Sequence, residues 1–313
     1  MPVCEDGSPW IQQRADPYVL RTPEGWYYFL ATVPEYDRIA IRRARSLEAL
    51  PGAPETVVWR RHAHGPMSRH IWAPEMHWLD GQWYIYFAAG EKDDPWKIRP
   101  YALVCAGNDP LADPWAECGM VQAAPDDAFS FQDFSLDMTV FTAQGRRYAV
   151  WAEKVNVGKK ISNLYIAEMA TPTRLKTAQV LLTTPDYAWE RQGFWVNEGP
   201  AVLQRGGRVF LTYSASETGA CYCMGMLTAR QDADLLDPQS WRKERFPVLA
   251  TDERRHLYGP GHNCFTQDAD GRDILVFHAR DGEAAPGDPL DDPNRHARLR
   301  VVQWDPEGCP RFA

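Results

Sequence analysis

Several features common in other protein classes are missing from this chain of 313 residues. No apolar run approaches the roughly 18 residues of a membrane-spanning helix. The seven cysteines contain no C-x-x-C pair, only the C-x-C of Cys221 and Cys223, so neither a zinc site nor a disulfide framework is expected. Residues 1–7 have neither a basic nor an apolar segment, which predicts no signal peptide and a cytoplasmic location.

Clustered positive charge is also lacking. The chain has 34 Lys and Arg against 42 Asp and Glu, a net charge of −8, so nucleic acid is excluded as a partner. No Ser/Gly-rich linker divides the sequence. We therefore expect a single domain over residues 1–313, existing as a monomer or a small homo-oligomer, with no membrane partner.

Tryptophan and proline are abundant, at 13 and 25 residues, which is typical of strands joined by many turns. A paired-strand unit recurs five times, with hairpins beginning near residues 15, 72, 136, 198 and 261. The turn glycines of these units are spaced 56, 64, 62 and 64 residues apart: Gly25, Gly81, Gly145, Gly207 and Gly271.

Each hairpin is followed by a third strand, and such a small sheet cannot cover both of its own faces. The pattern predicts an all-β fold, a five-bladed β-propeller whose blades have three to four antiparallel strands around a central channel. A β-sandwich or a run of separate small β-domains is the alternative.

One acidic residue, Glu198, lies among apolar neighbours in the stretch F-W-V-N-E-G-P-A-V-L. A carboxyl group in such surroundings is expected to have a raised pKa and to suit acid catalysis, although a loop position before Gly-Pro is the simpler interpretation. Asp16, Asp137, His262 and Trp72 occupy the same register, eight or nine residues before the turn glycine of their units. Inner strands line the channel of a propeller, so these side chains should converge at one end.

Paired carboxyl groups across a cavity are what glycosidic bond hydrolysis requires. One is protonated and assists departure of the leaving oxygen, while the other is ionised and activates water or attacks directly. A third carboxylate nearby can raise the pKa of the acid, because like charges in one site oppose ionisation.

Five motifs together resemble glycoside hydrolase family 43, in the same order and over nearly the whole chain. They are R-A-D-P-Y-V at residues 14–19, W-A-P-E at 72–75, S-L-D-M-T-V at 135–140, N-E-G-P-A-V at 197–202 and G-P-G-H-N at 259–263. The resemblance implies a five-bladed propeller and an inverting mechanism. It implies that Asp16 is the general base, Glu198 the general acid, and Asp137 the residue that orients the acid and raises its pKa.

Further strings resemble the α-L-arabinofuranosidase branch of that family: S-N-L-Y-I-A-E-M at 162–169, L-T-Y-S-A-S at 211–216, Y-C-M-G at 222–225 and D-P-N-R-H at 292–296. The implied activity is release of terminal α-L-arabinofuranose from arabinan-type or arabinose-substituted oligosaccharides. A β-D-xylosidase or an endo-arabinanase on the same scaffold is the alternative within the enzyme class. A non-catalytic sugar-binding propeller is the alternative outside it, although such a protein would not need three carboxylates in the channel.

Five side chains are expected to bind substrate: Trp72, Phe134, Trp195, His262 and Arg280. For His262 and Arg280 this role is what the family resemblance implies. The aromatic residues could equally belong to the core, and an arginine or histidine could equally have a structural role. No cofactor is required by the implied reaction. The resemblance allows a Ca²⁺-like ion in the central channel, contacted by His262 through water.

Overall fold

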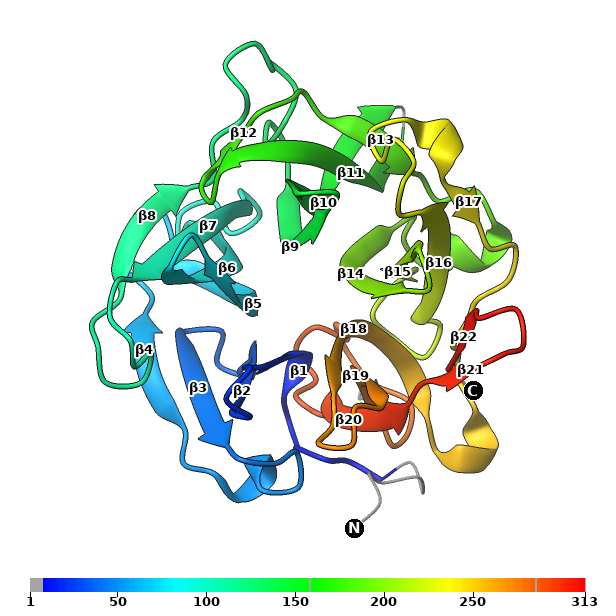
Figure 1. Ribbon diagram of the computed structural model, residues 1–313, viewed down its shortest axis with the longest axis horizontal. Coiled ribbons are helices and arrows are strands. Elements are labelled where there is room, and N and C mark those ends of the chain that lie inside the picture. Colours follow the sequence, from blue (N-terminus) through cyan, green and yellow to red (C-terminus); the bar gives the residue numbers. More distant parts are fainter. Residues whose placement is uncertain (1–7, 158, 285, 313) are drawn as a thin grey trace.

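The computed structural model describes residues 8–157, 159–284 and 286–312. The predicted absence of a signal peptide rests on residues 1–7, which lie outside these ranges. The described chain is all-β, and its only helical elements are short 3₁₀ turns. Antiparallel sheets surround a central axis as five blades, so the predicted propeller is confirmed and the sandwich alternative is wrong (Figure 1).

The five blades follow one another in sequence. Blade 1 contains β1 (Ala15–Arg21), β2 (Tyr27–Thr32), β3 (Arg38–Ala44) and β4 (Thr56–Arg60), and blade 2 contains β5 (Arg69–Leu79), β6 (Gln82–Gly90), β7 (Arg99–Cys105) and β8 (Ala116–Met120). Blade 3 contains β9 (Ser135–Ala143), β10 (Arg146–Val157), β11 (Lys159–Thr171), β12 (Arg174–Leu175) and β13 (Val180–Thr183). Blade 4 contains β14 (Asn197–Arg205), β15 (Arg208–Ala215), β16 (Cys223–Arg230) and β17 (Arg242–Lys243). Blade 5 contains β18 (Tyr258–Gln267), β19 (Asp273–Arg280) and β20 (His296–Val301), and a separate pair is formed by β21 (Gln303–Trp304) and β22 (Pro310–Arg311).

The ring is closed by the start of the described chain. Ile11 forms an antiparallel bridge with Ala297 of β20, and Trp10 also donates its backbone N–H to the Ala297 carbonyl. The N-terminal segment thus extends the three-stranded sheet of blade 5, and blades 1 and 5 are tied together. Buried apolar side chains fill the spaces between neighbouring blades, as where Tyr86 of blade 2 packs in one cluster with Val140 and Trp151 of blade 3.

The innermost strands β1, β5, β9, β14 and β18 each contain an irregularity near their first residues. The pairing register shifts after Ala15, Trp72, Leu136, Glu198 and Gly261, as expected for β-bulges. At each shift one residue has a left-handed backbone: Asp16 (φ 51°), Ala73 (47°), Asp137 (55°), Gly199 (54°) and His262 (42°). Such strain in non-glycine residues is concentrated at functional sites. Here it places polar side chains at one end of the channel.

No helix in the described ranges is long and apolar enough to span a membrane.

Candidate active site

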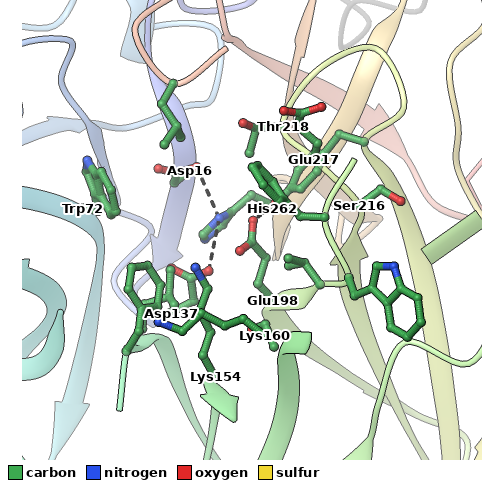
Figure 2. Close-up of a pocket in the computed structure, with 18 of the residues that line it drawn as sticks. Asp16, Trp72, Asp137, Lys154, Lys160, Glu198, Ser216, Glu217, Thr218 and His262 are labelled. Atoms are coloured by element: carbon green, nitrogen blue, oxygen red, sulfur yellow. Dashed lines mark hydrogen bonds and ion pairs between the residues drawn. The ribbon is translucent and has the colours of Figure 1, made fainter. Parts of the chain in front are cut away.

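A cavity of about 410 Å³ lies where the five inner strands begin, and residues of all five blades contribute to its lining (Figure 2). The three carboxylates predicted from the repeat, Asp16, Asp137 and Glu198, all line it. Of the predicted substrate-binding residues, Trp72, Phe134, Trp195 and His262 line it and Arg280 does not. Counting back from the turn glycines therefore identified residues whose side chains line one cavity.

Asp16 is held by groups from three directions. Its backbone N–H donates to Nδ1 of His278 (3.0 Å), and the Thr32 hydroxyl donates to its Oδ2 (2.6 Å). The guanidinium of Arg295 lies 3.6 Å from Oδ1. Burial alone would raise the pKa of Asp16, but the charges of His262 and Arg295 outweigh it and hold this pKa below its usual range. Asp16 is therefore ionised.

His262 lies between two of the carboxylates. Its Nδ1 is 3.2 Å from Oδ1 of Asp16 and 3.8 Å from Oδ2 of Asp137 (Figure 2). Burial would lower the pKa of His262, but the surrounding carboxylates, Asp16 first, raise it above its usual value. The imidazolium form is thus favoured, and it supplies positive charge between the two acidic residues.

Asp137 acts on the strand that carries Glu198. Its Oδ2 accepts a hydrogen bond from the backbone N–H of Gly199 (3.0 Å), the residue immediately after Glu198. Burial raises the pKa of Asp137, and the negative charges of Glu198 and Asp16 raise it further, against the opposite effect of His262. Two carboxyl groups that cannot easily ionise together are thus coupled through charge and through the Gly199 amide.

Glu198 is the second carboxyl group of the cavity whose pKa is raised. Burial raises its pKa, and this exceeds the opposing effects of the Tyr222 hydrogen bond, His262 and Lys154. The Tyr222 hydroxyl donates to Oε1 of Glu198 at 2.9 Å. Lys154 of β10 also lines the cavity, and its Nζ lies 3.7 Å from the centre of the Phe134 ring. From the sequence, Tyr222 was noted only as part of the Y-C-M-G string, without a role in the site, and Lys154 was not noted.

Aromatic side chains form the walls of the cavity. Trp72 stacks on His70, with ring centres 4.4 Å apart, and meets Tyr36 edge-on at 5.6 Å. Arg191 lies over the ring of Trp195 at 4.4 Å. Two further aromatic residues line the cavity and remain solvent-exposed: Trp96, on the loop between β6 and β7, and Phe194, on the segment before β14, at 52% and 61% exposure.

The prediction that Arg280 faces substrate is not supported by its position. Arg280 is buried behind the cavity, where it bonds to the Asp292 carboxylate and to the carbonyls of Thr218 and Pro289. These bonds tie two rim segments together. The arginine that lines the cavity is Arg295, which lies in the D-P-N-R-H string. The sequence contained both arginines, but only the fold shows which one reaches Asp16.

The surroundings of His262 do not fit direct coordination of an ion by Nδ1, because this atom is paired with Asp16 and Asp137. Within the described ranges no group of three His, Cys, Asp or Glu side chains is arranged as metal ligands. A water-mediated ion near His262 stays a prediction.

Two buried carboxyl groups and a third that is partly buried, of unequal basicity, are gathered with an imidazolium in an aromatic-walled cavity of a β-propeller. They form an acid–base site of the kind found in glycosidases. The model of glycosyl hydrolases family 43 matches residues 7–310, and the chain belongs to that family. The predicted family is confirmed.

Relatives with known names support a more specific comparison. The chain is 48% identical, over 97% of its length, to the extracellular exo-α-(1→5)-L-arabinofuranosidase of Streptomyces avermitilis, of which it spans 62%. It is also 48% identical, over 90% of its length, to the enzyme of the same name from Streptomyces chartreusis, of which it spans 84%. The crystal structure of α-L-arabinofuranosidase from Lactobacillus brevis superimposes with a TM-score of 0.92 at 48% identity, covering 98% of this chain and 95% of that one.

The predicted cytoplasmic location is wrong by this comparison, because both Streptomyces relatives are named extracellular. The prediction relied on the composition of residues 1–7 alone.

Proposed function

We propose that this chain is an inverting glycoside hydrolase that releases terminal α-L-arabinofuranose from arabinan-type or arabinose-substituted oligosaccharides. The observation that supports it most strongly is the opposite perturbation of two carboxyl groups in one cavity. The pKa of Asp16 is held low by the neighbouring cations, while burial raises the pKa of Glu198. A base and an acid are thus present at the same pH.

The proposed reaction assigns each carboxyl group one step. Glu198 donates its proton to the glycosidic oxygen as the bond from that oxygen to the anomeric carbon breaks. Asp16 accepts a proton from a water molecule whose oxygen attacks the same carbon from the opposite face. Both protons are accounted for, and the enzyme is restored when Glu198 regains a proton from solvent and Asp16 loses one. Room for that water predicts a separation of roughly 6.5–9.5 Å between the carboxyl groups of Asp16 and Glu198.

Asp137 is proposed to keep Glu198 protonated before the reaction and to hold its strand in place. A charge on either of these two carboxyl groups opposes ionisation of the other, and the bond from the Gly199 amide to Asp137 fixes the backbone next to the acid. His262 would keep Asp16 ionised. Trp72, Phe134 and Trp195 would then hold the furanose ring between apolar walls.

The cavity walls favour attack at a chain end over attack within a chain. On the side between blades 1 and 5, the Tyr36 hydroxyl donates to the Leu290 carbonyl, and Arg295 donates to the Tyr36 oxygen (3.0 Å). These bonds close that side of the cavity. The exposed rings of Trp96 and Phe194 lie on loops of other blades, where the leaving sugar could be received. By likeness to the Streptomyces enzymes, we propose α-(1→5) linkages as the preferred bond.

A substrate panel tests this proposal. It contains 4-nitrophenyl α-L-arabinofuranoside, 4-nitrophenyl β-D-xylopyranoside, and linear α-(1→5)-arabino-oligosaccharides labelled at the reducing end. The proposal predicts hydrolysis of the arabinoside, stepwise loss of single arabinose units and no internal cleavage. Preferential hydrolysis of the xyloside would indicate a β-D-xylosidase, internal fragments an endo-arabinanase, and binding without hydrolysis a sugar-binding propeller.

A further inference from the structure

Tyr222 has an unusual environment for a residue at a cavity wall. It lies just before β16, and its side chain is only 1% exposed. Its ring is parallel to the imidazole of His278, at 5.7 Å and 5°. The ring fits there because residue 261 is glycine: a Cβ at Gly261 would lie 2.4 Å from the Tyr222 ring and 2.9 Å from Oγ of Ser214. The fold thus leaves space specifically for this ring and for the neighbouring serine.

The Tyr222 hydroxyl donates a hydrogen bond to Oε1 of Glu198 (2.9 Å). The neighbouring serine is held in place by the backbone N–H of His262, which can only donate and which bonds to Oγ of Ser214 (2.7 Å). Ser214 acts against the rise in the pKa of Tyr222 that burial and the carboxylates cause.

We propose that Tyr222 is a positioning residue for the acid step, which keeps Oε1 of Glu198 occupied and leaves the transferable proton on Oε2. Two donors cannot face each other across one hydrogen bond, so a proton on Oε1 would conflict with the Tyr222 proton. Burial and the carboxylates raise the pKa of Tyr222 well above its usual value, so its hydroxyl remains a donor wherever the enzyme is active. This inference rests on the proposed role of Glu198 as general acid.

Tyr222 also has a link to the base. The ring it stacks on, His278, accepts the backbone N–H of Asp16, and burial lowers the pKa of His278 to about 3, so it remains a neutral acceptor. The Tyr222 side chain thus packs against His278, which holds the base Asp16. It also hydrogen-bonds to the acid Glu198. The relative placement of the two catalytic groups depends on it.

The Tyr222 hydrogen bond changes the pKa of Glu198 in a definite direction. Charged groups act on Glu198 from four other strands: Lys154 on β10 and His262 on β18 lower its pKa, Asp16 on β1 raises it, and Asp137 on β9 is coupled to it by charge. The Tyr222 bond stabilises the ionised form and therefore also lowers it. Removing only the hydroxyl should raise the pKa of Glu198 while the other charges stay in place.

The test is Tyr222→Phe, assayed with an α-(1→5)-linked arabino-oligosaccharide and with 2,4-dinitrophenyl α-L-arabinofuranoside. We expect kcat on the oligosaccharide to fall about 10- to 100-fold, because a misdirected acid assists a poor leaving group less. KM should be unchanged, and the dinitrophenyl substrate should lose less than threefold. The alkaline limb of the kcat profile should move up by about one pH unit, as expected for loss of a hydrogen bond to a charged group.

Tyr213→Phe is the matched control. Tyr213 is an equally buried tyrosine that donates to a carboxylate, Oε1 of Glu190 (2.8 Å), but it does not line the cavity. Its substitution should lower the melting temperature and leave the pH profile in place.

The Glu198 carboxyl can also be titrated without substrate, by ¹³C NMR of enzyme labelled at glutamate Cδ, with the resonance assigned from Glu198→Gln. A rise in its pKa in folded Tyr222→Phe supports the proposal. An unchanged Glu198 pKa overturns it, as do an unmoved alkaline limb or equal losses on both substrates when wild type is active. Failure of the wild type to hydrolyse any arabinoside would refute the proposed function instead, and the NMR titration would still decide the role of Tyr222.

Discussion

Replacing His262 by Asn would remove the positive charge between the carboxylates while preserving the backbone. The φ of His262 is 42°, in the left-handed region, and Asn is among the residues that tolerate this conformation. The side chain remains polar and of similar length. What is lost is the imidazolium that lies 3.2 Å from Asp16 and 3.8 Å from Asp137.

The size of the effect follows from these distances. With an effective dielectric constant of about 20, opposite unit charges at 3.2 Å attract by about 5 kcal/mol and at 3.8 Å by about 4 kcal/mol. Much of this is offset by the cost of burying the imidazolium. Because one pKa unit corresponds to about 1.36 kcal/mol, about a quarter of the attraction to Asp16 would suffice to raise the pKa of that residue by one unit.

Loss of the imidazolium would change the pKa of the acid and the pKa of the base in the same direction. Loss of a nearby positive charge raises the pKa of Asp16 and of Glu198, so both limbs of the profile of kcat/KM against pH should move to higher pH. His262 has a raised pKa in the folded state. Its stabilising contribution is therefore fully present below its unfolded value, near 6.5, and is lost as pH rises through the raised value. The variant should lack that pH-dependent part of the stability.

The assay is kcat/KM for 4-nitrophenyl α-L-arabinofuranoside between pH 4 and 9, with urea unfolding at pH 5 and 8. We expect the alkaline limb to lie about one unit higher in the variant than in wild type, and an acid limb within this range to move in the same direction. His77→Gln is the control. His77 pairs with Glu75 at 3.0 Å farther along β5 and does not line the cavity, so its loss should leave both limbs in place. An unmoved profile in folded His262→Asn would refute the electrostatic reasoning.

Three further outcomes are expected. Trp96→Ala should raise KM for arabino-oligosaccharides about 3- to 10-fold and leave KM for methyl α-L-arabinofuranoside unchanged, because its exposed ring beside the cavity is placed to stack on the second sugar. The control is Trp78→Ala, a residue that is 49% exposed at the opposite end of β5, and it should change neither KM value. Equal effects of Trp96→Ala on both substrates would contradict this role. Lys243→Met should lower the free energy of unfolding in urea by about 3–5 kcal/mol, because the carboxylate of Glu190 is fully buried 2.8 Å from the Lys243 ammonium. Adding Glu190→Gln should recover part of this loss. A loss under about 1 kcal/mol would argue against an essential ion pair. Proton NMR of the wild-type reaction should show β-arabinofuranose first, whereas initial α-anomer would exclude inversion.

The sequence was informative wherever a repeated local signal coincided with a single geometric rule. Turn glycines such as Gly81 and Gly145 marked the hairpins, and counting back from them placed Asp16, Asp137 and Glu198 in one register. In the structure these residues line one cavity because every inner strand begins at the same end of the channel. Glu198 and Trp72 lie one residue before the left-handed position that Asp16, Asp137 and His262 occupy in their strands. The β1–β2 and β18–β19 turns are also longer than the turns of the other three hairpins, and the two differences together account for the counts of eight and nine.

What the repeat could not predict was any contact made by a long side chain or a loop. Arg280 and Arg295 lie 15 positions apart in the same blade, and nothing local distinguishes them. Only packing shows that Arg280 anchors the rim and that Arg295 reaches the base. The role of Tyr222 was likewise not predictable from the sequence, because its ring fits beside Glu198 only since Gly261, 39 positions away, has no side chain.

The division of labour between Glu198 and Asp16 is tested most directly by a leaving-group comparison of Glu198→Ala with Asp16→Ala. Each variant is assayed with an α-(1→5)-arabino-oligosaccharide and with 2,4-dinitrophenyl α-L-arabinofuranoside, whose leaving group needs no proton. We predict that Glu198→Ala loses about 10²- to 10⁴-fold or more in kcat/KM on the oligosaccharide and recovers most of it on the dinitrophenyl glycoside. Asp16→Ala should lose activity severely on both. If the activated substrate rescued Asp16→Ala and failed to rescue Glu198→Ala, the two assignments would be reversed and the account contradicted.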